Sequence, residues 1–427
     1  MEHKNTQLKN MSQPQESTMN RAEGFGGLGI EPQLMRSLDA LRFKVPTPIQ
    51  HKTIPIALAG KDVIGIAQTG TGKTLAFGIP IIQRLAAMPG KQGLIILPTR
   101  ELALQVEETL QKVSRGFGLR TAVLIGGTGM GLQIKNLRNK PHIIIATPGR
   151  LQDHLTRKTV RLDSVAILVL DEADHMFDMG FAIPIKKILA LLPPERQTLL
   201  FSATMPPEIL KIATIYMQSP LRFEIAPQGT AAEKVEHELF FVQREQRMPL
   251  LKKILAENSG SALIFLRTKY AAKKTCQQLT AVNILAAEIH SNRSLSQRTE
   301  ALFGFKKGKY RVLVATDIAS RGIDVKEIAM VINYDLPESA SDYVHRIGRT
   351  GRAGLTGKAI SFAMPDQRNK IRAIERLIRY AIPISKTPGL PPISIIPIPQ
   401  ESRRNYTYNN NFQRKKKFNR NFSKPSL

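Results

Sequence analysis

The chain has 427 residues, 42% of them hydrophobic, and a formal net charge of +28 from 62 Lys and Arg against 34 Asp and Glu. This length exceeds one ordinary domain, and a single cysteine, Cys276, excludes an internal disulfide and is expected to be structural. The excess of positive charge favours a polyanionic partner, and nucleic acid is preferred over a membrane because no basic segment has a large apolar face. The N-terminus lacks the apolar core of a signal peptide, so a cytoplasmic protein is expected.

The first predicted domain follows a polar segment. Residues 1–22 are poor in large apolar groups and are predicted to be disordered. From about 25 to 218, short apolar runs alternate with helical patterns, which indicates a parallel sheet covered by helices. The runs lie at 63–64, 94–97, 123–125, 143–145, 167–170 and 199–201.

A second domain of similar design is predicted after a polar stretch near 226–236, from apolar runs at 263–265, 312–314 and 331–332. Residues 383–400 hold six prolines and are expected to form an extended connector rather than a packed element. The last 27 residues carry eight Lys or Arg against one Glu and are interleaved with five aromatic residues. Such a tail is either a solvated charge run or an RNA tether, and the aromatic rings, which can stack on unpaired bases, favour the tether.

A candidate phosphate-binding loop follows the first apolar run. "AQTGTGKT", residues 67–74, is placed between a strand and a helical pattern, where glycines let backbone N–H groups face phosphate oxygens. Lys73 would meet the β- and γ-phosphates and Thr74 would bind Mg²⁺. Ala67 stands where the usual motif has its first glycine, so the loop alone is also compatible with a chance glycine-rich turn.

An acidic cluster decides between these alternatives. "VLDEADHM", residues 169–176, places three carboxylates in four positions directly after a continuously apolar run. Carboxylates this close repel each other unless a cation is near, and the apolar run argues against a solvated acidic turn. A phosphate loop requires a second strand end that holds the metal and positions water, and Asp171 and Glu172 suit these two roles.

The remaining unusual clusters also follow predicted strands: "PTRELA" (98–103), "GG" (126–127), "TPGR" (147–150), "SAT" (202–204) and "TDIASRGID" (316–324). In open α/β sheets, ligands bind outside the carboxyl ends of the strands. One long functional edge is therefore predicted.

Together with "PTPIQ" and "HRIGRTGR", these motifs occur in an order and spacing that resembles a DEAD-box RNA helicase over roughly residues 23–375, and the 289–325 stretch is most similar to the bacterial RhlE-type subgroup. The resemblance implies an α/β fold of two RecA-like domains, each a parallel sheet flanked by helices, that close together on ATP and single-stranded RNA. The expected boundaries are 1–22 disordered segment, 23–51 Q-motif region, 52–222 domain 1, 223–236 linker, 237–382 domain 2, 383–400 connector and 401–427 disordered basic tail.

For the nucleotide, the resemblance implies that Gln50 reads the adenine edge, with Phe25 and Phe43 against or near the ring; the alternative is that both are core residues. Asp324 is expected to meet the ribose. The cofactors implied are ATP and Mg²⁺, the metal being held by Thr74 and Asp171. The phosphate-loop residues assigned to ATP are Ala67, Gln68, Thr69, Gly70, Thr71, Gly72, Lys73 and Thr74.

The catalytic set implied is Lys73, Asp171, Glu172, Arg349 and Arg352, the last two resembling arginine fingers that meet the γ-phosphate on closure. His345, alone more typical of a core histidine, is expected to bridge to the "DEAD" and "SAT" segments. The residues expected to couple nucleotide state to closure, or to organise the cleft, are Asp174, Ser202, Thr204, Asp317, Arg321 and His345.

Sequence-independent contacts to RNA phosphates and sugars are expected from both domains. The chain departs from the family at Leu295, where a glutamine often precedes Arg298 by three residues, and no contact is assigned there. The assigned residues are Pro98, Thr99, Arg100, Gly126, Gly127, Thr147, Gly149, Arg150, Thr268, Thr316 and Arg321.

The function expected is RNA-stimulated ATP hydrolysis that unwinds short RNA duplexes or remodels RNA–protein complexes, in ribosome assembly or RNA decay. A monomer is expected, with possible ribonucleoprotein or RNA-decay partners and no membrane. Two alternatives are an RNA clamp with idle hydrolysis, against which the intact catalytic set argues, and a DNA helicase, against which Gln50 with the full "DEAD" and "SAT" set argues.

Overall fold

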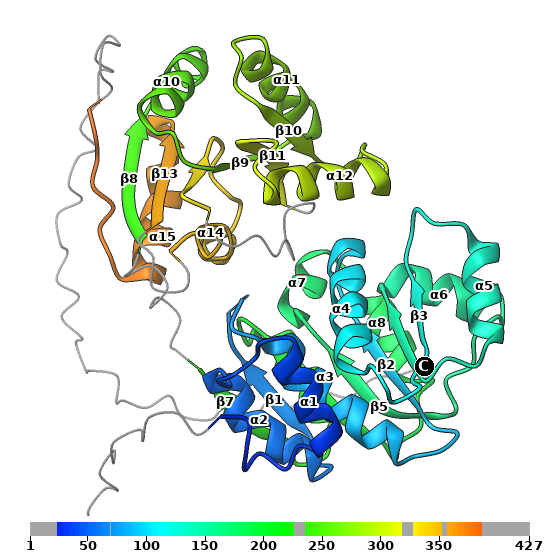
Figure 1. The fold of residues 1–427 in the computed structure, drawn as a ribbon. Helices are drawn as coiled ribbons and strands as arrows, with labels where there is room; N and C mark the ends of the chain where they lie inside the picture. The colour runs from blue at the N-terminus through cyan, green and yellow to red at the C-terminus, as the bar shows by residue number, and fades with distance from the viewer. Residues whose placement is uncertain (1–23, 69, 226–234, 318–327, 352–356, 387–427) are drawn as a thin grey trace, which may run out of the picture. The chain divides into compact units, whose positions relative to one another are not determined.

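The computed structural model describes residues 24–68, 70–225, 235–317, 328–351 and 357–386 (Figure 1). Within these ranges the chain builds two separate parallel sheets. We call the part around the first sheet, residues 24–225, the first lobe, and the part around the second, residues 235–386, the second lobe. No helix in the described ranges combines the length and apolar character needed to span a membrane.

The first lobe contains a seven-stranded sheet in the order β3-β4-β2-β5-β6-β1-β7, with every pair parallel. Three of its inner strands, β1, β4 and β6, are buried along their whole length, as expected for a sheet covered on both faces. The strands are β1 Val63–Ile66, β2 Gln92–Ile96, β3 Thr121–Leu124, β4 Ile143–Ala146, β5 Val165–Leu170, β6 Gln197–Ser202 and β7 Leu221–Glu224.

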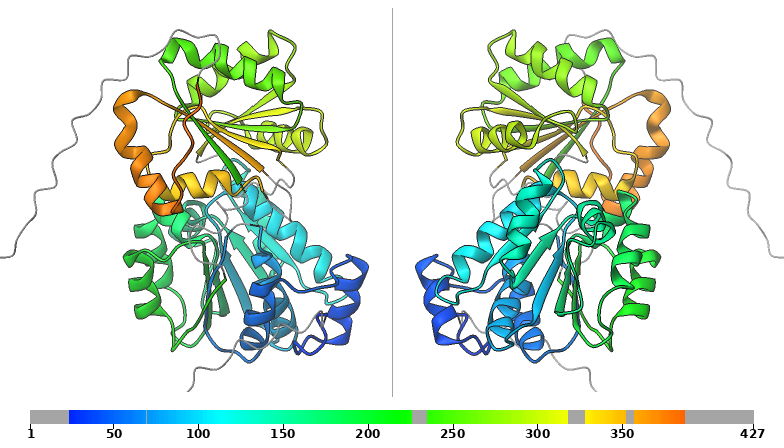
Figure 2. Two further views of the ribbon diagram at one scale, coloured as in Figure 1. Left: turned by 90° about the vertical axis from the view of Figure 1, so that its left-hand side faces the viewer. Right: turned by 90° about the vertical axis from the view of Figure 1, so that its right-hand side faces the viewer.

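Helices cover both faces of this sheet (Figure 2). Successive strand residues point to opposite faces, so the core divides into two clusters, with Ile95 and Val169 on one face and Leu94 and Leu168 on the other. The helices of the first face are α1 Pro32–Ala40, α2 Pro48–Leu58, α3 Lys73–Ala86 and α4 Arg100–Val113; the others are α5 Met130–Arg138, α6 Pro148–Thr156, α7 Ala173–Asp178, α8 Ala182–Leu189 and α9 Pro207–Tyr216.

The second lobe repeats the design with six parallel strands in the order β10-β11-β9-β12-β13-β8. Its strands are β8 Val235–Phe241, β9 Ala262–Leu266, β10 Ala286–Ile289, β11 Val312–Thr316, β12 Met330–Asn333 and β13 Gly357–Ala363. Its helices are α10 Arg244–Glu257, α11 Lys269–Thr280, α12 Leu295–Lys306, α14 Ala340–Ile347 and α15 Arg368–Ile378. The two tandem parallel sheets flanked by helices confirm the predicted fold class.

Three predicted boundaries differ from the structure. Helix α2 runs through the boundary at residue 51, because Pro48 opens a helix that continues into domain 1. The linker predicted at 223–236 is shorter, since β7 extends to Glu224 and β8 begins at Val235. The first residues of the predicted connector pair with the sheet: the Leu239 N–H donates to the Pro383 carbonyl at 2.9 Å, and the Ser385 N–H donates to the Leu239 carbonyl at 2.8 Å.

Those two bonds lie along β8, the edge strand of the second sheet. An edge strand presents unpaired backbone groups, and a short extended segment satisfies some of them. Residues 1–22, the rest of the connector after Lys386 and the tail 401–427 lie outside the described residues, so the predictions for them stand as made.

Candidate functional site

The glycine-rich loop joins β1 to α3. Gly72 caps α3 at φ 91°, a left-handed conformation that glycine adopts without strain, and a Cβ at this position would collide with the Gln50 amide. Lys73, the first residue of α3, is 6% exposed, and its Nζ lies 3.8 Å from Asp171 Oδ1 without a hydrogen-bond partner among the described residues. A buried ammonium with unused donors at a helix N-terminus suits phosphate oxygens. Thr69 lies outside the described residues.

The acidic cluster lies at the carboxyl end of β5, as predicted from "VLDEADHM". Asp171 and Glu172 are both buried, and Glu172 has φ 51°, which is unusual for a residue with a Cβ. Burial raises the pKa of Asp171 to about 6, although the Lys73 ammonium opposes this. Burial also acts to raise the pKa of Glu172, but the hydrogen bond and charge of His175 and the charges of Lys73 and Arg349 outweigh it and lower that pKa to about 2.

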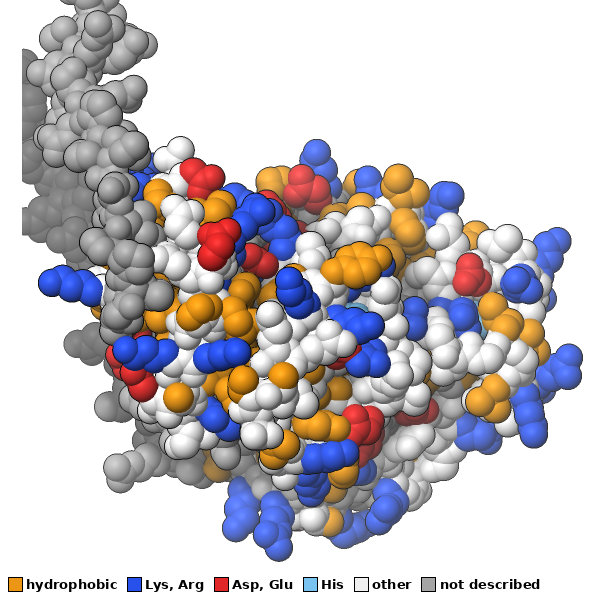
Figure 3. Space-filling view, turned by 90° about the horizontal axis from the view of Figure 1, so that it is seen from above, with side chains coloured by type: hydrophobic (Ala, Val, Ile, Leu, Met, Phe, Trp, Pro, Cys, Tyr) orange, Lys and Arg blue, Asp and Glu red, His pale blue; other side chains and the backbone are white. Residues whose placement is uncertain are grey.

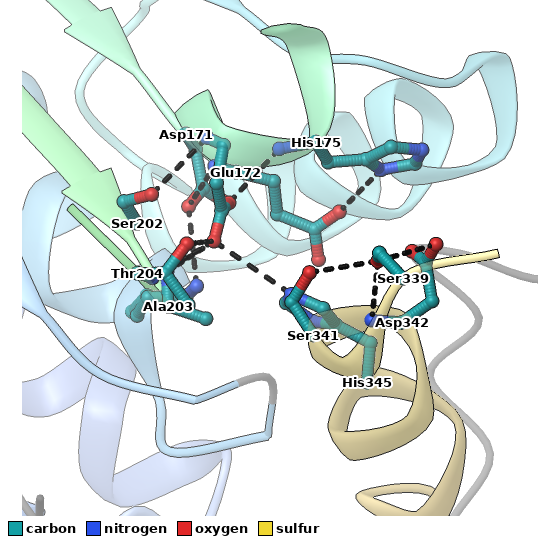
Figure 4. Close-up of polar contacts among 12 residues, drawn as sticks. Asp171, Glu172, His175, Ser202, Ala203, Thr204, Ser339, Ser341, Asp342 and His345 are labelled. Carbon is teal, nitrogen blue, oxygen red and sulfur yellow. Dashed lines mark hydrogen bonds and ion pairs between the residues drawn. The ribbon is translucent and has the colours of Figure 1, made fainter. Parts of the chain in front are cut away.

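His175 gives Glu172 its orientation: Nδ1 lies 3.2 Å from Glu172 Oε2, and both side chains are buried (Figure 4). Glu172 is therefore held ionised beside the lysine. An ionised, oriented carboxylate of this kind can accept a proton from water or hold it in place. His175 is not among the site residues predicted from the sequence.

A second set of contacts links the "DEAD" turn to the "SAT" strand end. The Asp174 Oδ2 atom accepts from Thr204 Oγ1 at 2.9 Å and from the Thr204 and Ala203 N–H groups at 2.8 and 3.2 Å. Ser202 Oγ in turn accepts from the Asp174 N–H at 3.1 Å. From the second lobe, His345 Nε2 lies 3.7 Å from Asp174 Oδ2. The structure thus brings four of the six coupling or cleft residues together.

Arg349 also lies beside the acidic cluster. It is buried, and it lines one small cavity of 10 Å³ with Lys73, Glu172, His175 and His345. Arg352, its predicted companion, lies outside the described residues.

Arg346, between His345 and Arg349, has a different role. Its Nε donates to Asp317 Oδ1 at 2.6 Å and its Nη2 to Asp317 Oδ2 at 2.7 Å. Its Nη1 donates to Asn333 Oδ1 and to the Asp335 carbonyl, and its guanidinium lies 4.8 Å from the centre of the Phe265 ring. Arg346 therefore holds α14 to the carboxyl ends of the second sheet. The role predicted for Asp317 in organising the cleft stays a prediction, and Arg321 and Asp324 lie outside the described residues.

The first-lobe RNA candidates converge from separate strand ends. The Arg100 guanidinium packs over Gly126 and Gly127, where a Cβ on Gly126 would come within 3.0 Å of Nη2 and one on Gly127 would collide. Arg150 Nη1 donates to the carbonyl of Thr128 at 3.0 Å. Three segments distant in the sequence thus form one surface. Of the other first-lobe candidates, Gly149 is exposed, whereas Pro98, Thr99 and Thr147 are buried. Thr99 and Thr147 are the N-cap residues of α4 and α6.

The second lobe supplies Thr268 and Thr316 from the ends of β9 and β11, which are adjacent strands. Thr268 is the N-cap residue of α11, and its side chain accepts from the Ala271 N–H at 3.1 Å. Lys and Arg side chains are widely spread over the face in Figure 3, where Asp and Glu are fewer, in keeping with the net charge of +28. A positive surface of this kind attracts phosphates without selecting bases.

The residues proposed for adenine differ in exposure. Gln50 is buried; its Nε2 donates to the Gly72 carbonyl at 2.9 Å, and its Oε1 accepts from the Thr47 N–H at 2.9 Å. An amide has two N–H donors and two acceptor lone pairs, so one of each remains for a base. Phe25 is 3% exposed and part of the first-lobe core, which favours the core alternative for it, whereas Phe43 is 38% exposed.

One contact between the lobes was not predicted. Arg298 Nη2 donates to Glu101 Oε2 at 2.7 Å, and both residues are buried. Leu295, one turn earlier on α12, packs against the hydrophobic core of the first lobe. Leu295 thus makes an apolar contact where the family often has an amide. In the sequence, the only indication of this contact was that Leu295 stands where the family often has a glutamine.

The residues present fit a nucleoside triphosphate and a divalent cation. The unused donors of Lys73 and the tight turn at Gly72 suit phosphates. Thr74 and Asp171 would supply a hydroxyl and a carboxylate, and oxygen ligands with phosphate and water completing the set are what Mg²⁺ prefers. Burial raises the pKa of Asp171, and a bound cation would lower it, because opposite charge favours the carboxylate.

Comparison with known families and proteins gives two matches along the chain. Residues 47–212 match the DEAD/DEAH box helicase family, and residues 246–354 match the helicase conserved C-terminal domain. The chain is 41% identical over 368 residues to the DEAD-box ATP-dependent RNA helicase CshA of Bacillus subtilis, covering 86% of this chain and 74% of that protein. It is 43% identical over 353 residues to the ATP-dependent RNA helicase CshA of Listeria monocytogenes, covering 82% and 68%.

Solved structures show the same architecture. Dbp5 of S. cerevisiae, bound to RNA and ADP BeF3, is 29% identical with a TM-score of 0.75, covering 85% of this chain and 95% of that one. The DEAD-box helicase Mss116, bound to ssRNA and UDP-BeF, is 29% identical with a TM-score of 0.78, covering 86% and 79%.

Proposed function

Because the chain belongs to the DEAD-box ATP-dependent RNA helicases, we propose that its two lobes hydrolyse ATP in response to single-stranded RNA and use the cycle to unwind short RNA duplexes or remodel RNA–protein complexes. The observation that carries this proposal is the buried Lys73 ammonium, which lies beside Asp171 with no hydrogen-bond partner among the described residues. Such a cation is poised for phosphate oxygens.

For hydrolysis, each side chain has a separate task. Lys73 binds the β- and γ-phosphates, and Thr74 and Asp171 would hold Mg²⁺, which neutralises phosphate charge. Glu172, oriented by His175, holds the attacking water. Arg349 stabilises the charge that develops on the γ-phosphate, and Arg352 is proposed as its partner.

Coupling between the lobes is proposed to run through Asp174. Its carboxylate accepts from the "SAT" turn and faces His345 on α14, the helix that precedes Arg349. A change at the phosphates that moves the "DEAD" turn would therefore change the position of α14. RNA is proposed to bind through Arg100, Gly126, Gly127 and Arg150, with Thr268 and Thr316 from the second lobe, by contacts to phosphates and sugars.

The experiment that tests the proposal compares ATP hydrolysis without nucleic acid, with single-stranded RNA and with DNA of the same sequence. We expect RNA to stimulate the rate and DNA to do so far less. Stimulation by DNA as strong as by RNA would favour the DNA helicase alternative, and RNA binding without stimulated hydrolysis would favour the clamp.

Finer assignments rest on the sequence alone. We propose structured RNAs of ribosome assembly or RNA decay as the targets, and a monomeric enzyme of the cytoplasm. The relatives reported above carry the name CshA, so they give no support to the RhlE-type subgroup, which stays a prediction. Sequencing the RNAs crosslinked to the protein in cells tests the first of these assignments.

A further inference from the structure

A buried polar network lies beneath the loop that carries Gly126 and Gly127. Its members are Gln133 on α5, 2% exposed, and His154 on α6, with no exposed surface. Neither residue belongs to a motif identified from the sequence, and neither reaches the phosphate loop. Buried polar side chains of this kind are retained only where their hydrogen bonds are satisfied.

The directions of these hydrogen bonds are determined by the loop. Gln133 Nε2 donates to the Ile125 carbonyl at 2.9 Å and to Thr128 Oγ1 at 2.5 Å. The reverse amide orientation would place Oε1 against the Ile125 carbonyl oxygen, so Oε1 faces His154 Nε2, 3.1 Å away. Nε2 therefore carries a proton toward Oε1. Nδ1 lies 2.8 Å from Thr159 Oγ1, and the Thr159 hydroxyl donates to the His154 carbonyl at 3.1 Å. Burial and the charges of nearby arginines lower the pKa of His154, which favours the neutral ring.

The other end of the loop is held from the "TPGR" segment. Arg150 Nη1 donates to the Thr128 carbonyl at 3.0 Å, so the carbonyl groups at both ends, Ile125 and Thr128, accept from side chains beneath the loop. Between them, Gly127 has φ 80° and is exposed. The loop is thus fixed at its ends and open at its middle.

Because the peptide bond is planar, the direction of each bonded carbonyl also gives the direction of the N–H group that follows it. In a trans peptide the N–H points opposite to the preceding carbonyl, and no cis bond occurs in the described residues. Because the Ile125 carbonyl points toward buried Gln133, the Gly126 N–H points away from the interior. By the same reasoning the Gly129 N–H points away from Arg150. Outward backbone donors beside the Arg100 guanidinium suit phosphate oxygens.

We propose that Gln133 and His154 are positioning residues that preorganise the Gly126–Gly127 loop for the phosphates of single-stranded RNA. The proposal rests on the proposed function, since it deepens the RNA-binding role of that loop. Gln133 sets the peptide plane, and His154 sets the orientation of Gln133. A loop held in its binding conformation loses less entropy when RNA binds, so the network acts on RNA affinity and leaves the phosphate chemistry unchanged.

The test uses Gln133→Glu in the full chain. This change keeps an oxygen acceptor for His154 but removes the donor to Ile125 and places a carboxylate oxygen against that carbonyl. Loss of a buried donor to a retained acceptor corresponds to about tenfold in an equilibrium constant. We expect the RNA concentration for half-maximal ATPase to rise about tenfold, with the rate at saturating RNA and the half-saturating ATP concentration unchanged.

Gln133→Met serves as the second variant, because it keeps the length of the side chain without introducing charge and remains informative if Gln133→Glu does not fold. The matched controls are Gln111→Glu and Gln111→Met on the exposed face of α4, which are expected to leave all three parameters unchanged. Unchanged RNA half-saturation in a folded Gln133 variant would overturn the proposal, and so would an equal loss of maximal rate or of ATP affinity. If the unmodified protein shows no response to RNA at all, the proposed function fails, and this inference fails with it.

Discussion

The carboxylate of Asp317, at the end of β11, accepts two hydrogen bonds from Arg346 on α14, at 2.6 and 2.7 Å. Arg346 is 3% exposed, and its remaining donors are bonded to Asn333 and Asp335. An arginine so fully engaged is unavailable to a nucleotide. Neighbouring arginines of "HRIGRTGR" thus divide between holding the second lobe together and facing the cavity lined by Lys73 and Glu172.

This division predicts opposite effects for two substitutions. Arg346→Ala leaves Asp317 and the strand ends without their partner and should lower the free energy of unfolding by about 3 kcal/mol. Arg349→Ala should lower the free energy of unfolding by less than Arg346→Ala but reduce RNA-stimulated turnover by about 10³-fold or more. Thermal or denaturant unfolding and steady-state ATPase rates measure the two effects. Equal loss of stability in both variants would contradict the division.

Glu172 is predicted to be needed for hydrolysis but not for nucleotide binding. Glu172→Gln keeps the shape of the side chain but removes the charge that orients water, so turnover should fall by about 10²-fold or more while ATP and RNA still bind tightly. Glu195→Gln, on an exposed position of the same lobe, is the matched control. Near-normal RNA-stimulated turnover of the Glu172 variant would remove this residue from the mechanism.

Base selectivity is predicted to depend on Gln50. Its amide has one donor and one acceptor position left after its bonds to Gly72 and Thr47, which matches the adenine edge and mismatches guanine, where donor and acceptor are reversed. ATP should therefore be turned over faster than GTP at subsaturating concentration, and Gln50→Glu should reduce this preference. Equal turnover of both nucleotides by the unmodified protein would rule out the assignment.

The contact between Arg298 and Glu101 is predicted to couple the lobes energetically. Each residue comes from a different lobe, and their side chains are buried at 2.7 Å. Removing one partner leaves the other charge buried and unpaired, so Arg298→Gln and Glu101→Gln should each reduce kcat/KM for RNA-stimulated turnover. The loss in the double variant should be smaller than the sum of the two single losses, with a coupling energy of about 1–3 kcal/mol. Additive effects would show that the contact does not stabilise the active arrangement.

The basic tail is predicted to act as a tether. Residues 401–427 carry a net charge of +7, eight Lys or Arg less Glu401, and follow a proline-rich connector. A chain that ends at Gln400 should bind RNA more weakly at low salt, lose this difference at high salt and keep the full ATPase rate at saturating RNA. Equal RNA affinity at low salt would exclude a tether, and a lost maximal rate would indicate a role nearer to catalysis.

The sequence predicted those strands that are continuously apolar, because a strand buried on both faces leaves that pattern. Four strands were missed because they lack this continuously apolar pattern. β7 reads Leu-Arg-Phe-Glu and is mostly exposed at the edge of its sheet, and β8, β10 and β13 mix polar and apolar residues. In these strands pairing with a neighbour, rather than hydrophobicity, decides the structure.

For the site, motifs predicted which segments meet but not the contacts that hold them. Asp171, Glu172 and Asp174 were found because acids after a buried strand are unusual. His175, Gln133 and His154 were missed, since a buried histidine or glutamine becomes meaningful only when the partner across the fold is known. Arg346 and Arg349 cannot be told apart as residue types in the sequence. Only the contacts in the fold, in which Arg346 donates to Asp317, distinguish their roles.

The most direct measurement of the central claim is strand separation of a short RNA duplex that carries a single-stranded extension. We expect rapid separation by the unmodified protein with ATP, little separation with ADP or without nucleotide, and a loss of ATP-dependent separation in Arg349→Ala. Separation at the same rate with ADP as with ATP, or none with ATP under conditions where RNA stimulates hydrolysis, would contradict the claim that this chain converts ATP hydrolysis into RNA unwinding.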